Sequence, residues 1–477
     1  MGTGILSDLF FWLPELILSG GAMAVLIGGV FARRQVAVAL AWLTVLGAGL
    51  SLASLSGRPE ILAGGTHFFG AIVLDPLSLV FRWLALGVIA FVVLMAQSSA
   101  DVEPQWTAEY LGLLLAVGVG LMLMAEANHL LMAYLSMELV SLGSYVLVGF
   151  GRDARSSEAS LKYLLFGALA SGIMLFGMSW VYGLTRSLSF PIIQEAMAGL
   201  PRSADAAVAV AMALLIAGLA FKISMVPFHM WTPDVYEGAP IPVTAMLSVG
   251  PKAAGIALLL RIAQALGPAW SAVGPAMMAL TIVTMTLGNL VAVAQRNVKR
   301  LLAYSTIAQV GYLLIGITAT TSLGLQAILV YLVAYLFMNL GAFACVVAVW
   351  NDSRDESLEA FRGLARRNPV IAFCLTLFLL SLAGLPPFVG FIGKFLLFGS
   401  AIDAKLIGLA VAGVINSAIA LYYYVNIIRL MYLEAPAEAA PLRPAPSLRL
   451  ALLICGSATL LLGIFPGALL DWLHRLI

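Results

Sequence analysis

The sequence predicts an all-α polytopic membrane protein, and three observations indicate this fold class. Of the 477 residues, 62% are hydrophobic and only 10% are charged, whereas a soluble globular domain carries about 25% charged residues. The apolar residues gather in runs of about 20, the length at which an α-helix crosses the hydrocarbon core of a bilayer. Inside such runs lie Lys222, Lys252 and Lys394, although the chain has only six lysines.

On this length rule the sequence predicts about fourteen transmembrane helices. Some connections are very short, such as residues 126–128 between the fourth and fifth helices. In chain order, the expected ranges are 9–31, 36–56, 73–97, 109–125, 128–150, 159–185, 207–230, 240–263, 272–295, 301–318, 323–350, 369–398, 403–432 and 447–473.

Basic residues between the helices predict the orientation of the chain. They cluster after helices one, five, nine, eleven and thirteen, which all end on one face, and the positive-inside rule assigns that face to the cytoplasm. Both termini are then expected on the periplasmic side. No basic residue precedes the first apolar run, so we do not expect a cleaved signal peptide. The clusters are Arg33/Arg34, Arg152/Arg155, Arg296/Lys299/Arg300, Arg354/Arg362/Arg366/Arg367 and Arg443/Arg449, and a minority on the other face comprises Arg58, Arg186, Arg202 and Arg261.

An internal repeat is indicated by the similarity of LSMELVSLGSYVLVG (135–149) to LAYSTIAQVGYLLIG (302–316). Tyr145 aligns with Tyr312, and the pair Pro227-Phe228 recurs as Pro387-Phe388. Because five helices separate corresponding points, the second copy would be inverted in the membrane. The expected parts are three N-terminal helices (1–105), a first five-helix repeat (106–265), a second, inverted repeat (266–435) and a C-terminal helix (436–477).

Two predicted helices, the seventh (FKISMVPFHMW) and the twelfth (LAGLPPFVGFIGKF), contain proline within the span. Proline removes a backbone hydrogen bond and kinks or breaks a helix. In transporters built from inverted repeats, such broken helices lie at the ion site. We expect water to satisfy the freed carbonyl groups and to wet a path towards the buried lysines.

Four charged residues at membrane depth form the main candidate site. Glu138 lies midway along the fifth helix, and Lys222, Lys252 and Lys394 each lie close to a proline in helices seven, eight and twelve. Ionisable residues in spans usually mark ion pathways, and a lysine can release its proton whereas an arginine cannot. A carboxylate that approaches a lysine favours the charged amine, so Glu138 and Lys222 form a candidate switchable pair. A static ion pair between helices is the alternative.

Two further residues are candidate accessory members of this site, where they could pass protons to or from the buried lysines. His229 follows the proline of helix seven by two residues, and an imidazole titrates near neutral pH. It either relays protons or makes a structural hydrogen bond at a helix end. Lys162 lies near the start of helix six, where it could also simply extend its ammonium group to the membrane surface.

Other charged residues have less specific interpretations. We expect Arg82, Glu126 and His129 to be interfacial, near the face opposite the basic clusters. Asp234 and Glu237 follow helix seven in WTPDVYEGAP, where acidic residues commonly form turns and helix caps; a functional role is the alternative.

The sequence offers no framework for a metal or a redox group. Cys345, Cys374 and Cys455 lie singly in apolar stretches without CxxC spacing and are expected to be small buried hydrophobic residues. With only four scattered histidines, the chain lacks a haem or iron–sulfur ligand set. No basic stripe suggests binding to nucleic acid.

At these residues the chain resembles the antiporter-like membrane subunits of proton-pumping NADH:quinone oxidoreductase, respiratory complex I, and among them the subunit N group. The similarity extends over roughly residues 110–430, and YEGAPIPVTA is typical of subunit N rather than of subunits L and M. The motifs that carry it are LSMELVSLGSYVLVGF, FKISMVPFHMWTPDVYEGAPIPVTAMLS, VKRLLAYSTIAQVGYLLIG and SLAGLPPFVGFIGKF.

The resemblance implies a function and a set of roles. Glu138, Lys222, Lys252 and Lys394 would form the proton relay of a translocase subunit in the respiratory chain of a bacterial inner membrane. NADH oxidation and quinone reduction would take place in other subunits. NADH, FMN, iron–sulfur clusters and quinone would therefore bind those partners and not this chain. The partners would be the other membrane-arm subunits, including further antiporter-like subunits, and the lipid bilayer.

Two alternatives to a complex I subunit stay open at the level of the sequence. A subunit of a multi-subunit cation/proton antiporter would share the fold and the lysines. A structural membrane anchor would retain buried charges that no longer conduct protons.

Overall fold

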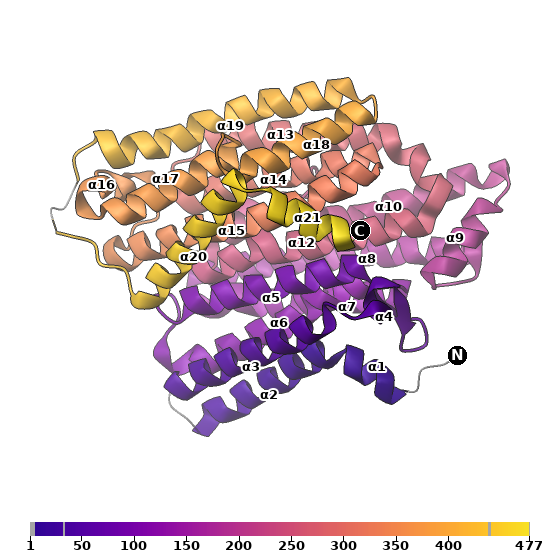
Figure 1. Cartoon of the computed structure of the whole chain (residues 1–477), viewed down its shortest axis with the longest axis horizontal. Helices are drawn as coiled ribbons and strands as arrows, with labels where there is room; N and C mark the ends of the chain where they lie inside the picture. Colours follow the sequence, from indigo (N-terminus) through magenta and orange to yellow (C-terminus); the bar gives the residue numbers. More distant parts are fainter. Residues whose placement is uncertain (1–4, 32–33, 437–439, 477) are drawn as a thin grey trace.

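The computed structural model describes residues 5–31, 34–436 and 440–476, and these are almost entirely helical (Figure 1). The α-helices are α1 (Ile5–Phe11), α2 (Leu13–Phe31), α3 (Arg34–Leu55), α4 (Pro59–Leu62), α5 (Pro76–Ala96), α6 (Thr107–Glu126), α7 (Leu130–Val148), α8 (Ala154–Thr185), α9 (Phe190–Ala198), α10 (Asp205–Ile223), α11 (Trp231–Gly238), α12 (Ile241–Leu266), α13 (Gly274–Val293), α14 (Val298–Ala319), α15 (Ser322–Ser353), α16 (Leu364–Arg367), α17 (Pro369–Ala383), α18 (Val389–Asp403), α19 (Ile407–Leu433), α20 (Pro446–Ile464) and α21 (Gly467–Leu476). Short 3-10 turns are η1 (Pro104–Trp106), η2 (Gly149–Gly151), η3 (Arg202–Ala204), η4 (Gly267–Val273) and η5 (Leu358–Phe361).

The long helices lie side by side and run roughly along one direction (Figure 1). The first helices, α2 and α3, lie along one edge of the molecule, and α19 lies along the opposite edge. Between these edges α12 packs against α5, α6, α10 and α15. Almost every residue of α12 is buried, so this helix forms the centre of the core.

The outer surface of the bundle is apolar, as expected where lipid replaces water. Large hydrophobic side chains are exposed on α3, α7, α8 and α19, for example Leu50, Leu142, Leu169 and Ile415. Twelve helices within the described residues are long and apolar enough to cross a membrane, and shorter apolar helices lie at Leu13–Gly29 and Pro369–Ala383. The prediction of an all-α polytopic membrane protein is confirmed.

One element was not predicted from the sequence. Strands β1 (Gly65–His67) and β2 (Ile72–Leu74) pair antiparallel and form a small hairpin. The third helix therefore begins at Pro76 and not at residue 73. Asp75 is the N-cap that fixes this start, because its side chain accepts a hydrogen bond from the backbone NH of Ser78 in a reciprocal capping box.

Both predicted helix breaks are present, but the chain unwinds instead of merely kinking. Helix α10 ends at Ile223 and the next helix begins at Trp231, while α17 ends at Ala383 and α18 begins at Val389. Side chains satisfy carbonyl groups at both breaks, where we expected water. The Trp231 indole donates to the carbonyl of Phe221 at 3.0 Å, and Lys394 donates to that of Ala383 at 3.1 Å. In contrast, α12 continues as a helix through Pro251.

The predicted basic clusters meet at one end of the bundle. Glu356, which follows α15, lies 2.5 Å from Arg155 and 2.6 Å from Lys299, so the ends of the predicted helices five, nine and eleven are adjacent. At the same end Arg34 donates to the carbonyl of Gln97. Helix α1, the first described helix, lies towards the opposite side of the picture, whereas α21, the last described helix, lies near its middle (Figure 1).

Candidate functional site

Lys222 lies fully buried in the last turn of α10. Its ammonium group donates to the Ser141 hydroxyl on α7 at 2.9 Å, and Ser141 donates in turn to the carbonyl of Met137. Glu138 lies on the same helix, three residues before Ser141, and interacts electrostatically with Lys222. No ion pair joins Glu138 directly to Lys222 among the residues that the structure describes. The direct partner of Lys222 on α7 is therefore Ser141 and not Glu138, and the sequence did not reveal it because serine is common in apolar helices.

Glu138 is only partly buried, and its carboxylate accepts a hydrogen bond from Ser171 of α8. Its neighbours along the helix surface, Leu135, Leu139 and Leu142, are exposed. A carboxylate at this depth is costly when it faces lipid. The partly exposed Glu138 carboxylate is thus surrounded by apolar side chains on this face of α7.

Lys252 is fully buried in α12, and its ammonium nitrogen has no hydrogen-bond partner within the described chain. It lies 4.5 Å from the centre of the Trp231 ring and 5.5 Å from that of Tyr236, distances at which the ring faces attract a cation. Lys222 and Lys252 are close enough to interact electrostatically. Each lysine therefore disfavours a second positive charge on the other.

Lys394 is the third lysine of the candidate site and is 2% exposed. Besides the carbonyl of Ala383 it contacts the Ser417 hydroxyl at 3.3 Å and lies 4.1 Å from the centre of the Tyr312 ring. These neighbours are dipoles and an aromatic face. They stabilise a cation only partly, because none of them carries a negative charge.

Two groups of buried polar side chains, which the sequence did not single out, lie near Lys252 and Lys394. The Tyr335 hydroxyl donates to Thr306 at 3.1 Å, and Tyr335 interacts electrostatically with Tyr236, which lies beside Lys252. A second group surrounds Tyr312, beside Lys394; it comprises Asn289, Asn416, Tyr423, Tyr424, Ser305, Gln309 and Tyr331. These residues are uncharged and scattered over helices α13, α14, α15 and α19, so no local sequence pattern marks them.

The two accessory candidates, His229 and Lys162, are not members of the polar groups around Thr306 and Tyr312. His229 is half-buried between α10 and α11, and its Nδ1 has no hydrogen-bond partner among the described residues. Within the part of the chain that the structure describes, its side chain forms no hydrogen bond or ion pair with Lys222 or Lys252. Lys162 forms ion pairs with Glu158 at 2.9 Å and Asp234 at 3.1 Å. It therefore joins a network of surface charges and does not simply extend to the membrane surface.

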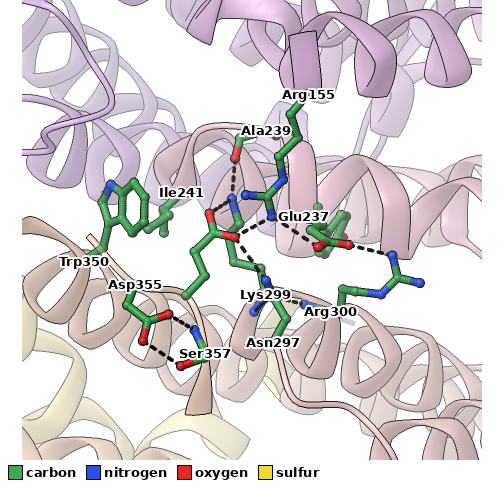
Figure 2. A network of polar contacts seen from close by, with 12 residues as sticks. Arg155, Glu237, Ala239, Ile241, Asn297, Lys299, Arg300, Trp350, Asp355 and Ser357 are labelled. Atoms are coloured by element: carbon green, nitrogen blue, oxygen red, sulfur yellow. Dashed lines mark hydrogen bonds and ion pairs between the residues drawn. The ribbon is translucent and has the colours of Figure 1, made fainter. Parts of the chain in front are cut away.

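The prediction that Asp234 and Glu237 form a turn and a cap is wrong. Both residues lie within α11. Arg300 of α14 contacts Asp234 at 2.9 Å and Glu237 at 2.6 Å, and Arg155 of α8 contacts Glu237 at 3.3 Å. Figure 2 shows Arg155, Glu237 and Arg300 converging from different helices. The acidic residues thus connect the two halves of the chain.

Glu356 is the centre of this network, because it contacts Lys299, Arg155 and Asn297. Its burial favours the neutral carboxyl, but the Lys299 ammonium and the donors from Asn297 and Arg155 outweigh burial and hold the pKa of Glu356 below its ordinary value. Lys299 is itself buried and donates to the carbonyl of Ala239 at 2.9 Å. The ionised form of Glu356 therefore stabilises the junction.

We expect Glu356→Gln to destabilise the folded chain by on the order of 3 kcal/mol, because it leaves the buried Lys299 ammonium without a counter-charge. A group whose pKa is lowered by folding stabilises the protein above its unfolded value of about 4.3, and this contribution disappears as pH falls below that value. The loss of the assembled protein on heating, followed on native gels from about pH 7 to about pH 3, checks both effects, because the difference between wild type and variant should narrow as pH falls below about 4.3. Asp355→Asn at the exposed neighbouring position is the control. Equal heat resistance of the two variants at pH 7 would contradict the expectation.

The prediction that Arg82 and Glu126, at the opposite end of the bundle, are interfacial is wrong. Both are fully buried together with Glu15. Only His129 is partly exposed, and its ring accepts a hydrogen bond from the NH of Leu131 at the start of α7. The local sequence could not reveal this cluster, because its members come from α2, α5 and α6.

The cysteines are unpaired; Cys345 and Cys455 are buried and Cys374 is partly buried. Within the described ranges no three His, Cys, Asp or Glu side chains are grouped so that they could hold a metal ion.

Comparison with known proteins places this site in a family. The family model described as NADH:quinone oxidoreductase/Mrp antiporter, transmembrane, matches residues 127–420. NADH-quinone oxidoreductase subunit N of Anaeromyxobacter sp. is 42% identical over 96% of this chain and 94% of that protein.

Solved structures give the same assignment. A chain of respiratory complex I from Thermus thermophilus is 34% identical, with a TM-score of 0.83 over 96% of this chain and 98% of that one. A chain of the Mrp complex from Dietzia sp. shares the fold, with a TM-score of 0.86 at 24% identity over 98% of this chain and 96% of that one. The chain therefore belongs to the family of NADH:quinone oxidoreductase/Mrp antiporter membrane subunits, and its relatives at about 40% identity include N subunits of NADH-quinone oxidoreductase.

Proposed function

We propose that this chain translocates protons across the membrane as a membrane-arm subunit of proton-pumping NADH:quinone oxidoreductase. The observation that carries the proposal is the placement of Lys222, Lys252 and Lys394. All three are buried, two of them lie beside a helix break, and none forms an ion pair among the described residues. A charged amine in such a place is costly, so small changes in its surroundings suffice to make it release or accept a proton.

The proposed relay uses the electrostatic order of these groups. When the Glu138 carboxylate and the Ser141 hydroxyl stabilise it, the Lys222 amine holds a proton. If Glu138 is neutralised or drawn away, Lys222 releases this proton towards Lys252, whose charged form the aromatic rings of Trp231 and Tyr236 favour. The polar groups around Thr306 and Tyr312 then offer hydrogen-bonding partners for transfer towards Lys394. Each step moves one proton between neighbouring sites and leaves the covalent structure unchanged.

The partner that changes the charge state of Glu138 would lie outside this chain. The exposed surface of α7 around Glu138 fits a neighbouring membrane-arm subunit, since a protein surface would cover the carboxylate and the adjacent leucines. The complex I identity of the Thermus structure and the names of the relatives support this choice. We further propose that NADH, FMN, iron–sulfur clusters and quinone bind partner subunits, and that this chain holds no redox cofactor.

A subunit of a multi-subunit cation/proton antiporter is the second candidate function, because the matching family includes Mrp antiporters. The identity of 24% to the Mrp chain supports only the fold, whereas relatives at about 40% identity are complex I subunits. Purification of the tagged chain from its native membrane distinguishes the two. We expect flavin and iron–sulfur absorption and NADH:quinone activity in the purified complex. A complex that lacks these but exchanges cations for protons would establish the antiporter.

The proposed orientation places residues 352–367 in the cytoplasm and both termini on the periplasmic side. A single cysteine introduced as Ser353→Cys should not react with a membrane-impermeant thiol reagent in intact cells. The matched control Phe69→Cys, at an exposed hairpin tip on the opposite end, should react. Both are made with the three native cysteines replaced by alanine. Labelling of position 353 from outside, with position 69 protected, would reverse the orientation.

A further inference from the structure

A second buried group of ionisable side chains lies in the N-terminal helices and takes no part in the proposed relay. It consists of Glu15 on α2, Arg82 on α5 and Glu126 at the end of α6, and all three are 0% exposed. If both carboxyls were ionised, this triad would carry one uncompensated negative charge. An unpaired buried charge costs several kcal/mol, so the charge count alone favours one neutral carboxyl.

The hydrogen bonds indicate which carboxyl is ionised. Arg82 binds Glu15 through two parallel contacts, Nε to Oε1 at 2.7 Å and Nη2 to Oε2 at 2.5 Å. Such bidentate pairing is typical of a guanidinium with an ionised carboxylate. The same Nη2 also donates to the carbonyl of Phe11 at 3.0 Å. Glu15 thus neutralises Arg82.

Glu126 has a different environment. One of its oxygens lies 3.0 Å from Arg82 Nε, but neither oxygen has a hydrogen-bond donor among the described residues. Its carboxyl is also within hydrogen-bonding reach of the Glu15 carboxyl. Two ionised carboxylates cannot form such a bond, because neither has a hydrogen to donate, whereas a protonated Glu126 can donate to Glu15.

The surrounding charges do not remove the imbalance. Arg261 of α12 interacts electrostatically with Glu126, but it is itself neutralised by Asp75, to which it donates two hydrogen bonds of 2.6 Å. With these two residues included, three carboxyls still face two guanidinium groups. Asp8 and His67 form a further contact at 2.8 Å, next to Phe11.

We propose that the Glu15–Arg82–Glu126 triad is a proton-binding site, in which Glu126 holds a proton at neutral pH and donates it in a hydrogen bond to ionised Glu15. The site is separate from the lysine relay and does not depend on it. It lies near the end of the bundle that carries the hairpin, because Ala127, the residue after Glu126, bridges to Ile72 of β2. Within this triad, Glu15 is paired with the Arg82 guanidinium through two hydrogen bonds, whereas Glu126 accepts none from it.

Infrared spectroscopy of the intact complex in lipid tests the proposal. A neutral carboxylic acid has a carbonyl band that an ionised carboxylate lacks, and the band shifts in D₂O. At neutral pH, the difference between the wild type and Glu126→Gln should show the loss of one such acid band per chain. Glu60→Gln, at an exposed carboxylate of α4, should show only the loss of ionised carboxylate bands. If Glu126→Gln shows only the loss of ionised carboxylate bands, the proposal is wrong.

Glu15→Gln gives a second, independent test that remains available if Glu126→Gln fails to assemble. With Glu15 neutral, Glu126 should ionise and become the counter-charge of Arg82, so the same acid band should disappear although Glu126 is still present. Persistence of the band would overturn the proposed charge distribution. The double variant leaves Arg82 without a counter-charge and should yield less assembled complex than either single variant; assembly equal to that of the single variants would contradict the charge count.

Discussion

Lys222→Ala will leave the complex assembled but lower NADH-driven proton pumping more than about tenfold, because a positioned proton-transfer group typically contributes about 10²- to 10⁴-fold. The Lys222 ammonium group, in the last turn of the broken helix α10, donates to Ser141 of α7 at 2.9 Å. Alanine removes the proton carrier, whereas the apolar packing of α10 against α8 and α12 is retained. Proton uptake by reconstituted vesicles and the amount of complex on native gels are the two measurements.

Lys405→Ala is the matched control, since Lys405 is an exposed lysine beyond the end of α18. It should pump at the wild-type rate. A Lys222→Ala complex that assembles and pumps like this control would show that the buried charges are structural. The chain would then be a membrane anchor and not a proton-conducting subunit.

Glu138→Gln will preserve assembly and impair pumping several-fold. The amide keeps the shape of the side chain and can still accept the hydrogen bond from Ser171, but it removes the negative charge that stabilises the charged Lys222 amine. Glu138→Asp should retain part of the activity, because the charge survives at a slightly greater distance. Pumping is measured at equal amounts of assembled complex.

Glu158→Gln, at an exposed carboxylate on α8, should have little effect on pumping and serves as the control. The ranking of wild type, Asp and Gln at position 138 separates the roles of charge and shape. If Asp were as damaging as Gln, the position would require a specific shape, and the electrostatic coupling to Lys222 would not account for it.

The sequence was sufficient to predict an all-α membrane fold and the buried lysines, because both depend on local composition. Long apolar runs specify helices in a bilayer regardless of their partners, and a lysine inside such a run is conspicuous. The proline motifs likewise located the two breaks. Their detailed form was not predictable, since the carbonyl of Phe221 is satisfied by Trp231 from beyond the break.

The contacts between distant segments could not be predicted from the sequence. Ser141 became relevant only when α10 placed Lys222 beside it, and Glu15 reaches Arg82 across 67 positions of the chain. The error over Arg82 and Glu126 has the same origin. A charge near a helix end suggests the membrane surface, but neighbouring helices can cover that end and bury the charge when a partner neutralises it.

The proposed relay depends on the release of a proton by a buried amine, and Lys222→Arg tests this most directly. Arginine keeps a positive charge at the position but cannot release its proton at physiological pH. The measurement is the initial rate of NADH-driven proton translocation in vesicles containing equal amounts of assembled complex. We expect the rate of the arginine variant to be nearly as low as that of Lys222→Ala. Pumping at the wild-type rate by the arginine variant would contradict it, because a fixed positive charge would then be sufficient.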